Sequence, residues 1–115
     1  MITDKLLVFL TAWILENTEF DKKVDNPEFY ILNKQEMSDK ACFSEENCRV
    51  KAYYIKDSGI YYINELDPLN DICDQSIILH ELIHHYQKNR NKKMDLDEQT
   101  LWTLQERQAL YYQNL

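Results

Sequence analysis

The stretch SIILHELIHHYQ, residues 76–87, contains all three histidines of the chain. If this stretch is helical, each residue turns by about 100°, so His80 and His84 project from one face about one turn apart. Two imidazoles placed in this way can share one tetrahedral zinc ion, with Glu81 beside a water molecule at the metal. The spacing therefore predicts two metal ligands, His80 and His84, and one general base, Glu81.

His85 is expected to lie outside the ligand set. Its side chain follows that of His84 directly and points about 100° away from it on a helix. We expect His85 to lie at the surface or to brace the site.

A catalytic zinc site needs a third protein ligand. In the metzincin pattern a Gly would stand at position 87 and a His at position 90. This chain has Gln87 and Arg90 instead, which excludes that pattern. Because no further histidine remains, the third ligand must be a carboxylate or Cys73.

Glu106 is the downstream acid best placed to be this ligand. It lies in the middle of a predicted helix, with Trp102 and Ala109 on nearly the same stripe, so its side chain is expected to face inward. The small Ala109 would let this helix approach the histidine helix. The alternative is a solvated glutamate that pairs with nearby basic side chains. Three other acids crowd the start of the same helix, where acids serve as caps and dipole partners: Asp95, Asp97 and Glu98.

Apolar periodicity predicts the helices that must carry these residues. Long helices are expected at 3–17, 71–89 and 97–113, and a short helix or turn at 34–39. Asp71 or Asp74 is expected to cap the second long helix.

Aromatic and β-branched runs predict the strands. One strand is expected at 27–32, and a hairpin at 50–65, in which Gly59 supplies a positive φ angle at the turn. Strands and helices in this order predict an α+β fold, a single domain spanning 1–115, with a small, mostly antiparallel sheet.

Composition narrows the classes of protein to which the chain can belong. With 44% hydrophobic residues and a single glycine, the chain is expected to fold. A net charge of −7 argues against binding of nucleic acid. The apolar run at 6–15 is too short to span a membrane, and its flanks do not fit a signal peptide, so a core helix is expected there.

The three cysteines bear on the compartment. Cys42 and Cys48 bracket a short polar loop and could close it as a disulfide, which would indicate an oxidising, exported location. The alternative is three separate thiols.

The motif and the order of elements together resemble a known enzyme group. HELIH at 80–84, followed 22 residues after His84 by Glu106 in ERQA, resembles the gluzincin zinc metallopeptidases, which include thermolysin. The chain looks most like the smallest members, the minigluzincins and small bacterial metallopeptidase-like proteins. The resemblance implies zinc bound by His80, His84 and Glu106, Glu81 as general base and acid, and a peptide or protein substrate.

Two departures from the gluzincin pattern stand out. Leu110 occupies the position one turn after Glu106, where larger members often have an acid that orients a histidine ligand. No C-terminal subdomain that would supply a histidine to stabilise the oxyanion is expected after the last predicted helix, so we expect that Tyr111 or Tyr112 would have to substitute.

In zincins the substrate typically adds as an extended strand along the sheet edge above the metal. The run IYYIN, residues 60–64, is expected to be that edge, unless its tyrosines are ordinary strand residues. Two other functions remain open: a noncatalytic zinc-binding domain that uses the same ligands, and a metal-free interaction module on a peptidase-like scaffold.

Overall fold

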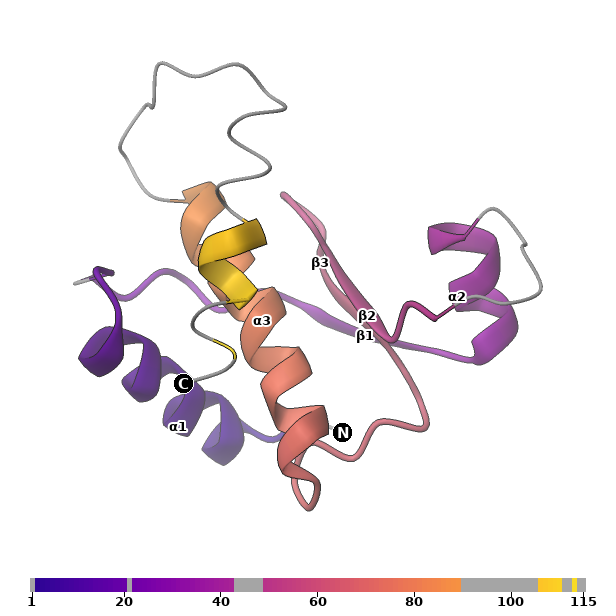
Figure 1. Ribbon diagram of the computed structural model, residues 1–115, viewed down its shortest axis with the longest axis horizontal. Helices are drawn as coiled ribbons and strands as arrows, with labels where there is room; N and C mark the ends of the chain where they lie inside the picture. The colour runs from indigo at the N-terminus through magenta and orange to yellow at the C-terminus, as the bar shows by residue number, and fades with distance from the viewer. Residues whose placement is uncertain (1, 21, 43–48, 90–105, 111–112, 114–115) are drawn as a thin grey trace.

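The computed structural model describes residues 2–20, 22–42, 49–89, 106–110 and 113. Their elements are helices α1 (Asp4–Asn17), α2 (Lys34–Ala41) and α3 (Ile72–Asn89), and strands β1 (Phe29–Leu32), β2 (Ala52–Ile55) and β3 (Gly59–Ile63). Residues 106–110 are helical as well. The predicted α+β class is confirmed (Figure 1). Most of the last predicted helix, including Tyr111 and Tyr112, lies outside the described residues.

The three strands form a mixed sheet in the order β1-β3-β2. β2 and β3 form the predicted antiparallel hairpin, whereas β1 pairs in parallel with β3. The sheet is therefore not mostly antiparallel. The long connection from β1 to β3, which contains α2 and β2, allows the chain to return in the same direction.

The strand order corrects the expected substrate edge. Residues 60–64 were expected at the edge of the sheet, but β3 is the central strand because β1 pairs with its second side. The edges of this three-stranded sheet are β1 and β2.

Gly59 shapes the contact between the hairpin and β1. Its φ is +151°, and Asp57 in the same turn has φ +67°, so the expected positive φ is confirmed at Gly59. A Cβ atom at position 59 would clash with the backbone carbonyl oxygen of Glu28. The same carbonyl accepts a hydrogen bond from Ile60 N at 2.8 Å. Glycine is therefore needed for β1 to lie this close to β3.

The helices cover both faces of the sheet. Figure 1 shows α1 and α3 on one side and α2 on the other. Side chains alternate along β3, with Ile60 and Tyr62 buried in the core and Tyr61 stacked between Tyr30 and Tyr53. The main core lies between the sheet, α1 and α3, and its most buried apolar side chains are Leu10, Ile14, Ile60, Tyr62, Ile78, Leu82, Ile83 and Tyr86.

Local caps begin each helix near its predicted start. Thr3 caps α1 by accepting a hydrogen bond from Leu6 N through its hydroxyl, and Asn33 with Glu36 forms a capping box on α2. Of the two expected caps on α3, Asp71 performs the role: its carboxylate accepts from the backbone N–H groups of residues 73 and 74.

Two of the cysteines lie in the described part of the chain. Cys42 is disulfide-bonded, and Cys73 is a free, exposed thiol. Three separate thiols are therefore excluded. Cys48 lies outside the described residues.

Among the described residues, none of the helices combines the length and the apolar character that a membrane crossing requires.

Replacing Gly59 with Ala should destabilise the fold. The added Cβ meets the Glu28 carbonyl, and φ +151° is unfavourable for an L side chain, so the free energy of unfolding should fall by about 2 kcal/mol. Urea unfolding would measure the loss. Lys56→Ala, an exposed substitution in the same turn, is the control. Equal stability of the two variants would contradict the close approach of β1.

Candidate metal centre

Helix α3 separates its core side chains from the two histidines that could hold a metal ion. Its buried apolar residues recur at helical spacing and face α1 and the sheet: Ile78, Leu79, Leu82, Ile83 and Tyr86. The rings of His80 and His84 lie together, with centroids 4.8 Å apart. The expected stacking of the two histidines on one side of a helix is therefore confirmed.

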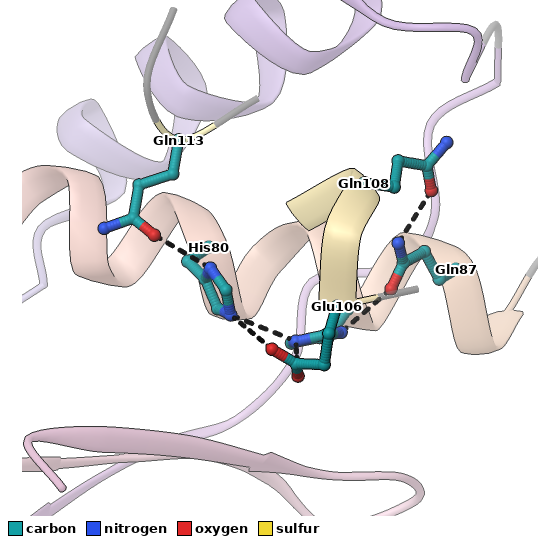
Figure 2. A network of polar contacts seen from close by, with 6 residues as sticks. His80, Gln87, Glu106, Gln108 and Gln113 are labelled. Atoms are coloured by element: carbon teal, nitrogen blue, oxygen red, sulfur yellow. Dashed lines mark hydrogen bonds and ion pairs between the residues drawn. The ribbon is translucent and has the colours of Figure 1, made fainter. Parts of the chain in front are cut away.

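Glu106 reaches the same point from the C-terminal helical segment (Figure 2). Its carboxylate oxygens lie 2.7 Å from His84 Nε2 and 3.6 Å from His80 Nε2. The two Nε2 atoms are 3.1 Å apart. Ligand atoms of the three residues all lie within 4.8 Å of one another. The fold thus brings together the three residues that the sequence analysis singled out as ligands.

Glutamine side chains fix the outer nitrogen of each imidazole. His80 Nδ1 lies 2.8 Å from Gln113 Oε1, and His84 Nδ1 lies 2.8 Å from Gln87 Oε1. An amide oxygen only accepts, so each Nδ1 carries a hydrogen, and in the neutral imidazole each Nε2 then has a lone pair that a metal could take. Outer partners of this kind orient metal-binding histidines.

The donor set fits a cation. Two imidazole lone pairs and one carboxylate converge in a small space, with side-chain exposures of 12% for His84, 13% for His80 and 31% for Glu106. A cation between these atoms would be bound by all three donors and would offset their mutual repulsion. Two imidazoles and a carboxylate suit zinc and other divalent transition metals.

Burial also favours the metal-binding form of His80. It lowers the pKa of His80, and the neighbouring His84 lowers it further, whereas Glu106 opposes both effects. Neutral imidazole is the form that donates a lone pair to a metal.

Glu81 lies on α3 between the side that carries His80 and His84 and the side that packs in the core. Its side chain is buried, with 8% of the residue exposed. Burial, and after it the negative charge of Glu106, raises the pKa of Glu81 from 4.5 to about 8. A carboxyl group poised near neutrality beside a candidate metal site has the properties of a general base.

His85 is not at the surface, which corrects one of the two roles expected for it. The residue is 8% exposed, and its Nε2 lies 2.6 Å from the carbonyl oxygen of Asp25. Its Nδ1 lies 3.0 Å from the hydroxyl of Tyr54 on β2. His85 therefore ties α3 to the sheet and to the segment before β1, and stays outside the ligand group.

Cys73 does not join the ligand group either. It lies in the first turn of α3, exposed, nearly two turns before His80. Glu106 takes the third place among the described residues.

The sequence analysis did not single out the two glutamines that contact the candidate ligands, Gln87 and Gln113. Gln87 entered it only as a departure from the metzincin pattern, although its position three residues after His84 puts both on one helix face. Gln113 carried no sequence signal, because its contact with His80 spans 33 residues. Gln113 does provide the orienting oxygen that Leu110, which is 48% exposed, cannot.

Glu81→Gln should stabilise the metal-free protein at alkaline pH. The folded protein keeps a proton on Glu81 up to about pH 8, whereas the unfolded chain releases it near pH 4.5, so wild-type stability falls across that interval. Glutamine cannot ionise and removes this loss, on the order of a few kcal/mol at pH 8.

Thermal melts from pH 5 to pH 8, with a chelator present, would measure the difference. Glu65→Gln, an exposed change of the same charge, should leave the pH dependence as in the wild type. Parallel pH profiles for wild type and Glu81→Gln would show that Glu81 is not held neutral.

Comparison with known proteins places the chain in a family without adding an activity. No curated protein and no solved structure matches it significantly. Residues 2–110 match a family model described as Domain of unknown function (DUF6647), and this match covers most of the chain. The protein therefore belongs to the DUF6647 family.

Proposed function

We propose that this protein is a zinc-dependent metallopeptidase of the gluzincin type. The observation that carries the proposal is the convergence of His80 Nε2, His84 Nε2 and the Glu106 carboxylate, with the buried carboxyl of Glu81 close enough to feel the charge of Glu106. Three protein ligands leave room for water or substrate, which is the arrangement of a catalytic rather than a structural zinc site.

Zinc bound there would act as a Lewis acid toward a water molecule and toward the carbonyl of the bond to be cleaved. Glu81 accepts the proton from the attacking water and returns it to the leaving amine nitrogen. In the metal-free protein burial raises the pKa of Glu81 to about 8, and a cation bound nearby would lower it, so that the carboxylate could accept a proton near neutral pH. Gln87 and Gln113 keep the two imidazoles turned with Nε2 toward the metal.

The substrate class that fits is an extended peptide. β2 is an edge strand and the strand in closest contact with α3, and no strand in the described part of the chain pairs with its outer side. Main-chain hydrogen bonds along such an edge would hold a peptide next to the metal helix.

The disulfide bond at Cys42 supports the proposal that the protein functions in an oxidising compartment. Disulfides persist in exported proteins and are rare in the reducing cytosol.

Metal analysis of the purified protein tests the site first. Wild type should carry about one zinc per chain after reconstitution, whereas Glu106→Gln should lose most of it, because the amide removes the charged ligand. Glu65→Gln is the matched control, since it makes the same substitution at an exposed position. If the wild type takes up no zinc from excess metal, the enzyme proposal is rejected and a metal-free interaction domain is the reading that stays.

A peptide-cleavage assay then separates catalysis from structural metal binding. Glu81→Gln should retain zinc but lose at least about 100-fold in cleavage of a mixed peptide library, the usual contribution of a general base. A noncatalytic zinc domain would be favoured by two results together. The wild type would bind zinc without cleaving any peptide, and Glu81→Gln would leave the stability of the zinc-bound protein unchanged.

A further inference from the structure

A chain of hydrogen bonds leads outward from His84 to the segment after α1. Gln87 accepts from His84 Nδ1 through its Oε1 at 2.8 Å, and its Nε2 donates to Gln108 Oε1 at 2.7 Å (Figure 2). Gln108 Nε2 in turn donates to a carboxylate oxygen of Glu19. These hydrogen bonds join α3, the C-terminal helical segment and residue 19, which is 89 positions from Gln108 in the sequence.

The far end of this chain sets its direction. A carboxylate only accepts hydrogen bonds, so Gln108 must turn its NH₂ group toward Glu19. Its oxygen then faces Gln87, and Gln87 must offer its own NH₂ to that oxygen. The oxygen of Gln87 is left for His84, which requires the hydrogen of His84 on Nδ1.

We propose that Glu19 and Gln108 are positioning residues that act through Gln87 to hold His84 with its Nε2 lone pair toward the metal. This role rests on the proposed metal site, although Glu19 and Gln108 would touch neither the metal nor the substrate. Outer partners of a ligating histidine change metal affinity through ligand orientation, although they make no bond to the metal.

The influence of each residue falls with its exposure. Gln87 is 4% exposed, so its hydrogen bonds form away from water and cannot be replaced by it. Gln108 is half-buried and Glu19 is exposed. The largest effect is therefore expected at Gln87 and the smallest at Glu19.

Zinc dissociation constants, measured by competition with a chelating dye, give the first test. Gln87→Leu should weaken zinc binding by about 10- to 100-fold. Glu19→Lys places a donor-only group at the end of the chain, which reverses its preferred direction and should weaken binding about 2- to 5-fold, the size of one exposed charged contact. Glu16→Lys, the same charge change at an exposed position on α1, should have no comparable effect.

A double-mutant cycle separates a relay from a general loss of stability. Once Gln87→Leu has cut the chain, Glu19→Lys should have no further effect on zinc affinity. Additive losses, or equal losses from Glu19→Lys and Glu16→Lys, would overturn the proposal. Far-UV circular dichroism of each variant checks that it is folded.

A metal-independent readout keeps this test distinct from that of the metal site. In metal-free protein labelled with ¹⁵N, the side-chain NH₂ protons of Gln87 should be protected from exchange with water, and Glu19→Lys should reduce that protection whereas Glu16→Lys should not. An unchanged exchange rate in Glu19→Lys would refute the relay even if zinc binds. Absence of zinc binding with the expected change in exchange would instead refute the proposed peptidase and retain the relay.

Discussion

Mutual repulsion of three electron-pair donors is the constraint on which the site depends. The Nε2 atoms of His80 and His84 stand 3.1 Å apart, with the Glu106 carboxylate in contact with both. In this partly buried position a shared cation would offset the repulsion, as would a proton on one of the imidazoles. The surrounding fold resists this repulsion, because α3 fixes the two histidines one turn apart and glutamine oxygens prevent either imidazole from turning its lone pair away.

One helix, α3, contributes side chains both to the core and to the candidate metal site. The period of α3 puts aliphatic side chains against α1 and the sheet, and His80 and His84 on another side. His85 occupies a third direction, where Tyr54 and the carbonyl of Asp25 hold it. The three polar roles at positions 81, 84 and 85 are therefore set by the turn of a single helix whose depth in the fold is fixed by its apolar stripe.

The sheet supports α3 and, in the proposed function, provides the edge strand to which a peptide would add. Its parallel β1–β3 pair depends on Gly59, since a side chain there would collide with the carbonyl of Glu28. That pairing places β3 in the centre and leaves β2 at the edge next to α3. Which strand lies at the edge beside α3, where the proposed substrate would add, is thus decided by a backbone contact made on the opposite side of the sheet.

Helical period, caps and turn residues act over a few positions, so the sequence by itself predicted the helices α1 to α3, the hairpin, the α+β class and the placement of His80 and His84 on one side of α3. Glu106 was predicted from its place on a helical stripe and from the resemblance to gluzincins, whereas its contact with the two histidines was decided by the tertiary structure. Strand order was decided only by tertiary structure, since the pairing of β1 with β3 joins segments about 31 residues apart. The buried position of His85 depends on Tyr54 and Asp25, which are 31 and 60 residues away in the sequence. The contact between Gln113 and His80 joins residues 33 positions apart. No pattern of neighbouring residues encodes such contacts; they arise when the packed core fixes which polar groups meet.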